Sequence, residues 1–217
     1  MNNFLKSALL LLVACATSFV QAEEAGDAKA GESKIALCIG CHGIKGYQAS
    51  FPEVYRVPMI SGQNAKYIVS ALSAYKKGER KHPSMRGIAD TLSEQDMADL
   101  GAYYEQHGKT EPVATAPKAP DAKVAALLQK GACISCHGDN FAKPIDPSYP
   151  KIAGQHKDFL FVALKSYKVE NQATWGRNNG VMGGIAKQFS NAELKAMSAY
   201  IGSLDGEMRV IPQSRLR

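Results

Sequence analysis

Apolar residues recur at the spacing of a helix face through most of the chain. After Ser93, the residues Met97, Leu100 and Tyr104 recur every three or four positions, as on the buried side of an amphipathic helix. Ser93 is a favourable N-cap, and the acidic residues that follow it suit the first turn of a helix. Apolar stretches elsewhere do not alternate as strands would, so the pattern predicts an all-α protein.

The same pattern occurs twice along the chain. The motif Pro-x-Ile-[Ser/Ala]-Gly-Gln stands at residues 58–63 and again at 150–155, and Gly-Ile-Ala stands at 87–89 and again at 184–186. The offset is 92 residues for the first pair and 97 for the second, as small loop insertions would produce. We therefore interpret the chain as two copies of one module of about a hundred residues.

Each copy is expected to hold three main helices. The first runs into a cysteine motif, the second follows the Gly-Gln pair, and the third follows a serine cap. The six predicted ranges are 28–39, 64–77, 94–106, 122–135, 156–169 and 191–202.

A linker is predicted between the two copies. The stretch 109–120 contains three prolines and lacks apolar periodicity, which indicates an extended and fairly stiff connector. The linker separates a first domain at 23–108 from a second domain at 121–217.

The first 22 residues indicate a signal peptide. Lys6 supplies a positive start, a short apolar run follows it, and Ala22 provides a small residue at the cleavage position. Two alternatives stay open, namely an uncleaved N-terminal anchor and a lipoprotein in which Cys15 carries the lipid. Because the apolar run is too short to span a bilayer, we favour cleavage after residue 22 and export.

The charge of the protein is unevenly placed. Hydrophobic residues make up 45% of the chain and charged residues 21%, which is a globular composition. Residues 23–108 carry a net charge of −1, whereas residues 121–217 carry +5. This asymmetry would orient the protein against a charged partner, and an ordinary solvated surface explains it equally well. No run of basic residues supports a nucleic-acid partner.

Four of the five cysteines stand in two Cys-x-x-Cys-His motifs, which comprise Cys38, Cys41 and His42 in the first copy and Cys133, Cys136 and His137 in the second. This motif is the attachment signature of haem c. Two thiols one helical turn apart can bond the two vinyl groups of a porphyrin, and the adjoining imidazole then reaches the iron. The sequence therefore predicts two covalently bound haem c groups, each with one histidine ligand.

Zinc binding, thiol redox chemistry and disulfide formation are weaker interpretations of the cysteine pairs. A zinc ribbon places its pairs about 15–20 residues apart, whereas these pairs lie 95 residues apart. A thioredoxin-type redox pair follows a strand in a βαβ unit, and no strand-like run precedes either motif. Structural disulfides occur in exported proteins but leave the two histidines without a role.

The second axial position of each iron decides between an electron carrier and an enzyme. A methionine there saturates the iron and raises its reduction potential, whereas an open position allows ligand binding or peroxide chemistry. Met85 and Met182 occupy matching places, each two residues before the repeated Gly-Ile-Ala. Met59 fails this test because its counterpart is Lys151. We therefore predict that Met85 and Met182 are the second ligands of two fairly high-potential haems.

With these motifs the chain resembles the two-haem cytochromes c4, within the class I cytochromes c. The resemblance covers nearly the whole mature chain and includes the repeated Gly-Gln segments, the Tyr-Lys-Lys-Gly-Glu-Arg stretch at 75–80 and the helix opening at 92–100. It implies two tandem class I cytochrome c domains with their haems close together. It also implies that the carbonyls of Pro58 and Pro150 accept hydrogen bonds from the two histidine ligands.

The resemblance implies a periplasmic electron carrier without catalytic residues, often held loosely at the inner membrane. Its expected partners are the quinol-oxidising complex as electron donor and a haem–copper terminal oxidase as acceptor. Two alternatives stay open, a cytochrome subunit of a larger dehydrogenase such as a flavocytochrome, and a two-haem peroxidase. The matched methionines argue against the peroxidase, because that enzyme needs one iron with an open site.

Overall fold

The computed structural model describes residues 25–109 and 118–212. The signal peptide predicted at 1–22, including Cys15, and most of the linker predicted at 109–120 lie outside these residues. The described chain is mostly helical, and its strands have two residues each, which confirms the all-α prediction. None of the helices in the described ranges is both long and apolar enough to span a bilayer.

The first copy is built from five helices and three short strands in the described chain. The helices are α2 (Ala28–Glu32), α3 (Ala36–His42), α4 (Ala65–Lys77), α5 (Pro83–Asp90) and α6 (Glu94–Gln106). The strands are β1 (Gln48–Ala49), β2 (Tyr55–Arg56) and β3 (Arg80–Lys81), of which β1 and β2 pair antiparallel.

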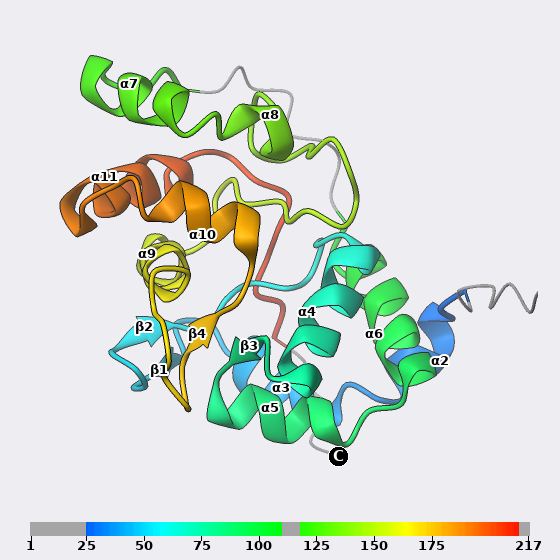
Figure 1. The fold of residues 1–217 in the computed structure, drawn as a ribbon. Helices are drawn as coiled ribbons and strands as arrows, with labels where there is room; N and C mark the ends of the chain where they lie inside the picture. The colour runs from blue at the N-terminus through cyan, green and yellow to red at the C-terminus, as the bar shows by residue number, and fades with distance from the viewer. Residues whose placement is uncertain (1–24, 110–117, 213–217) are drawn as a thin grey trace, which may run out of the picture.

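The second copy repeats the five helices and has one short strand in the described chain. Its elements are α7 (Ala122–Lys130), α8 (Ile134–His137), α9 (Lys157–Ser166), β4 (Gly176–Arg177), α10 (Gly180–Ala186) and α11 (Asn191–Gly202). Strand β4 pairs antiparallel with β3 of the first copy, so the two copies share a small sheet. Figure 1 shows β3 and β4 side by side, and the C-terminal segment running from α11 into the first copy.

The second and third predicted helices of each copy are close to the observed ones. Helices α6 and α11 have the predicted bounds, and each begins with a capping box, Ser93 with Asp96 and Ser190 with Glu193. In a capping box, the serine and the acidic side chain satisfy each other's backbone N–H groups. Helix α9 ends at Ser166, three residues before the predicted end.

The prediction of one continuous first helix in each copy is wrong. The range 28–39 is divided by a turn between α2 and α3, and the range 122–135 by a turn between α7 and α8. In the second copy Gly131 ends α7, and the next residue, Ala132, adopts a left-handed φ of 46°. The break gives each cysteine motif a short helix of its own.

Two separate hydrophobic cores support the two copies. In the first, α2 and α4 pack on α6 around Met97 and Leu100, and in the second, α7 and α9 pack on α11 around Leu194 and Met197. Cys38 packs against the first core and Cys133 against the second. Each cysteine motif is therefore anchored to its core through its first thiol.

The buried carboxylate of Asp99 ties the start of the first copy to α6. It is 2% exposed and accepts hydrogen bonds from the backbone N–H of Asp27 at 2.8 Å, Gln95 Nε2 at 2.8 Å and Lys34 Nζ at 2.6 Å. The hydrogen bond from Lys34, together with that from Asp27, holds the pKa of Asp99 below its usual value.

Asp99→Asn is expected to lower the free energy of unfolding at neutral pH by about 1–3 kcal/mol, because charge-assisted hydrogen bonds to a buried group are lost. The folded pKa lies below the unfolded one, so this stabilisation is present above about pH 4 and fades as the pH falls through the folded pKa. Denaturant unfolding followed by circular dichroism at several pH values measures it.

The matched control is Asp90→Asn. Asp90 forms an exposed ion pair with Arg86 at 3.7 Å, and such pairs contribute about 1 kcal/mol or less. An equal loss for both variants, or a loss at Asp99 that persists unchanged in acid, would contradict this account of Asp99.

Candidate haem sites

The two cysteine motifs lie on matching short helices. Cys38 and Cys41 are one turn apart on α3. Cys133 is the N-cap residue of α8, and Cys136 lies one turn further on, within that helix. All four are free thiols in the structure, so the disulfide alternative is not realised. Burial raises the pKa of Cys38 and of Cys133, whereas Cys41 is exposed. The first pair thus has one partly buried and one exposed thiol, whereas both thiols of the second pair are partly buried.

Both histidines of the motifs are oriented by a proline carbonyl. The Nδ1 atom of His42 lies 2.8 Å from the carbonyl oxygen of Pro58, and Nδ1 of His137 lies 3.2 Å from that of Pro150. These contacts confirm the hydrogen bonds implied by the resemblance. When Nδ1–H donates to a carbonyl, Nε2 keeps its lone pair for a metal.

The environment of both rings favours their neutral form. Burial lowers the pKa of His42 and of His137, and the acceptor carbonyl opposes that shift only in part. A neutral imidazole is the form that ligates iron. The lowered pKa therefore favours the form that can act as a metal ligand.

Met85 and Met182 occupy the same position in two helices that the sequence did not predict. Each is the third residue of its helix, α5 or α10, and its backbone N–H donates to the side chain of the N-cap residue. The cap is His82 at 3.5 Å in the first copy and Asn179 at 2.9 Å in the second. The repeat places no histidine opposite His82, and the structure shows that Asn179 takes its place as a cap.

An arginine pair at the shared sheet was missed by the sequence analysis. Arg80 and Arg177 face each other in the β3–β4 register. Arg80 stacks 4.7 Å above the Tyr75 ring and donates to Tyr67 Oη at 3.1 Å, and Arg177 stacks 5.3 Å from the Tyr167 ring centre. The available signal was that each arginine stands five residues before a candidate methionine.

This arginine pair has cationic charge that the described chain does not neutralise. Within residues 25–109 and 118–212, neither arginine forms an ion pair with a carboxylate, and Nε of Arg80 is buried without a hydrogen-bond partner. Two neighbouring guanidinium groups repel each other. Their arrangement therefore suits a ligand that carries acidic groups.

Comparison with known proteins identifies the family. The cytochrome c family model matches residues 28–107 and 122–205. A cytochrome c4 from Stutzerimonas stutzeri is 32% identical over 219 residues, which cover 94% of this chain and 100% of the relative. The chain belongs to the cytochrome c4 family.

A solved cytochrome c4 has the same architecture. The crystal structure of reduced recombinant cytochrome c4 from Pseudomonas stutzeri is 29% identical, covers 83% of this chain and 100% of its own, and gives a TM-score of 0.64. Like other members of the cytochrome c4 family, this protein is a dihaem electron carrier with two covalently bound haem c groups, and it is not an enzyme.

A more distant relative is named for a different role. The thiosulfate dehydrogenase electron acceptor from Stutzerimonas stutzeri (strain A1501) is 28% identical over 176 residues, which cover 77% of this chain and 78% of the relative.

Substitution of the candidate methionines tests the axial ligands. In the ferric protein, Met85→His and Met182→His should each abolish about half of the weak sulfur-to-iron absorption band and lower the potential of one haem, because imidazole stabilises the ferrous state less than a thioether does. Visible spectra with haem quantification and a reductive titration measure both effects.

The matched control is Met59→Leu, since Met59 has no methionine counterpart in the second copy. It should keep the full band. An unchanged spectrum after either histidine substitution would show that this methionine is not the ligand.

Proposed function

We propose that each copy holds one haem c through its two thiols and ligates the iron with one histidine and one methionine. The first domain, residues 23–108, contributes Cys38, Cys41, His42 and Met85, and the second, residues 121–217, contributes Cys133, Cys136, His137 and Met182. The support is that the thiols are free, both imidazoles have a lowered pKa and are oriented by a carbonyl, and both methionines stand at the same helical position.

Arg80 and Arg177 are proposed to bind acidic groups of the haems. Haem c carries two propionate groups, and arginine is the side chain best suited to bind a carboxylate. The buried Nε of Arg80 without a partner supplies a donor for such a group. The acidic edges of the haems are thus proposed to meet the two arginines at the shared sheet.

The chain's residues restrict this site to electron transfer. The bound haem supplies a one-electron iron couple. If the histidine and the methionine of each copy hold the iron, they would leave no open coordination site for a reactant. The proline carbonyls fix the imidazole rings, which limits the rearrangement that accompanies oxidation and reduction.

The carrier is proposed to act in the periplasm, between the quinol-oxidising complex and a haem–copper terminal oxidase. The observation that carries this proposal is the match to cytochrome c4 along 94% of the chain, joined to the export signal predicted at residues 1–22. A second candidate, the electron acceptor of a substrate dehydrogenase, is favoured by the relative that accepts electrons from thiosulfate dehydrogenase.

Direct reactions with isolated complexes separate these roles. The haem absorbance is followed after the oxidised protein meets the quinol-oxidising complex, and after the reduced protein meets the oxidase. Rapid reaction with both is expected. Failure with both, combined with rapid reduction by a thiosulfate dehydrogenase and its substrate, would overturn the respiratory role.

Charge reversal near the second haem motif is expected to slow the reaction with an acidic partner. Lys143 is exposed in the loop behind His137, within the half that carries +5. Lys143→Glu should lower the second-order rate constant severalfold at low salt, and added salt should reduce the difference, because surface charges mainly set the encounter rate. Stopped-flow absorbance measures this rate.

The matched control is Lys45→Glu, an exposed lysine in the loop behind His42. The first half carries a net −1, so a smaller effect is expected there. Equal effects at both positions would contradict docking through the second half.

A further inference from the structure

A reciprocal pair of glutamines joins the two copies. Gln63 accepts from the backbone N–H of Lys151 at 2.9 Å and donates to its carbonyl at 2.9 Å. Gln155 makes the same two hydrogen bonds to Met59, at 3.0 and 2.9 Å. Gln63 corresponds to Gln155 in the repeat, and Met59 corresponds to Lys151. The contact therefore has an approximate two-fold axis between the copies.

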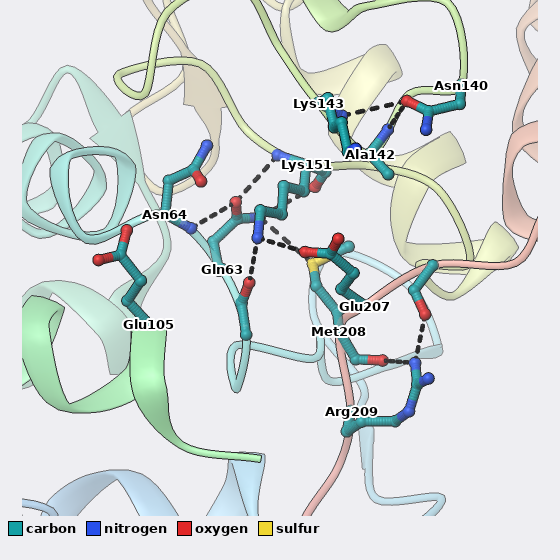
Figure 2. Close-up of polar contacts among 12 residues, drawn as sticks. Gln63, Asn64, Glu105, Asn140, Ala142, Lys143, Lys151, Glu207, Met208 and Arg209 are labelled. Atoms are coloured by element: carbon teal, nitrogen blue, oxygen red, sulfur yellow. Dashed lines mark hydrogen bonds and ion pairs between the residues drawn. The ribbon is translucent and has the colours of Figure 1, made fainter. Parts of the chain in front are cut away.

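One residue without a counterpart in the repeat lies on this axis. The sulfur of Met208 is 3.3 Å from Nε2 of Gln63 and 3.6 Å from Nε2 of Gln155. All three side chains are buried, with Met208 only 2% exposed. Figure 2 shows the sulfur of Met208 directed at Gln63, whose amide also contacts Lys151.

Met208 satisfies donors that would otherwise be unpaired. Each glutamine amide has two N–H groups, of which one donates to a backbone carbonyl of the other copy. The Met208 sulfur is the acceptor that the structure places near the same nitrogen atoms. A thioether is a weak acceptor, but a buried N–H left without any partner is costly.

The segment that carries Met208 is held by both copies. The N–H of Arg209 donates to the carbonyl of Ser61 at 3.0 Å, and Glu207 pairs with Lys151 Nζ at 2.7 Å. Gly206 approaches so closely that an added Cβ would lie 2.0 Å from the carbonyl oxygen of Ala153. The segment thus passes through the interface and cannot be displaced without separating these contacts.

The same short segments carry the histidine contacts of both sites. Pro58 accepts from His42, and the adjacent residue, Met59, is bonded to Gln155. Pro150 accepts from His137, and the adjacent residue, Lys151, is bonded to Gln63. The carbonyl that orients each candidate histidine ligand therefore belongs to the residue directly before one that joins the two copies.

From this geometry we infer that Met208 is a positioning residue for electron transfer between the two haems. Its thioether holds Gln63 and Gln155 in the reciprocal arrangement, which fixes the two domains, and hence the two haems, in one relative orientation. The inference rests on the proposed placement of one haem in each domain. Electron tunnelling falls steeply with distance, so a loosened interface slows the transfer between haems.

Met208→Leu tests the inference, because leucine has a similar volume and lacks the sulfur acceptor. Hydrogen exchange should become about tenfold faster at the backbone N–H groups of Met59 and Lys151, which the glutamines cover. The rate of electron transfer between the haems, measured after rapid reduction of one of them, should fall severalfold. The spectrum of each haem should stay unchanged, because no ligand is altered.

The matched control is Met59→Leu, which makes the same substitution at the same interface. The hydrogen bonds between Met59 and Gln155 use the backbone of Met59, so exchange at Lys151 and the transfer rate between haems should equal those of the unaltered protein. Unchanged exchange in Met208→Leu would overturn the inference, and so would faster exchange with an unchanged transfer rate. The experiment uses no external partner, so its outcome is independent of the respiratory role.

Discussion

The hydrogen bond from each histidine to a proline carbonyl is the interaction on which both halves of the molecule depend. It fixes the tautomer and the direction of the imidazole, and it does so from the Gly-Gln segment that precedes α4 in the first copy and α9 in the second. That segment also supplies the glutamine and the backbone groups of the contact between copies. The orientation of the ring and the orientation of the domains are therefore set by the same short segment in each copy.

This arrangement explains why two small domains are joined so extensively. Beyond the glutamines, Arg56 pairs with Asp158 at 2.9 Å and Lys165 with Glu53 at 2.6 Å across the contact. Strands β3 and β4 bring the two arginines together next to the helices that carry the candidate methionines. A polar contact of this kind fixes direction as well as distance, because hydrogen bonds are directional. A carrier that passes electrons between two centres benefits from both.

The sequence predicted those features that depend on residues close together in the chain. The helices that follow the caps Ser93 and Ser190 are predictable because the cap and the apolar periodicity lie within the same short stretch of sequence. The cysteine motifs and the matched methionines are recognisable because the repeat displays them twice. The domain limits at 108 and 121 and the ligand assignments stay predictions.

The sequence did not predict the breaks after α2 and α7, since helix continuity there depends on packing of the motif against the core. The unpredicted contacts join residues far apart in the chain: Arg80 meets Arg177 across 97 positions, and Met208 has no counterpart in the first copy that could mark it. A residue on the two-fold axis contacts both copies at once, so a single residue serves both and the repeat does not reveal it.

The most direct measurement of the central claim is the proton spectrum of the reduced, low-spin protein. A methionine methyl group bound to haem iron lies over the porphyrin ring, whose ring current moves its resonance far upfield. We expect two such methyl resonances, one from each copy. A single one, or none, in protein that contains two haems would contradict it.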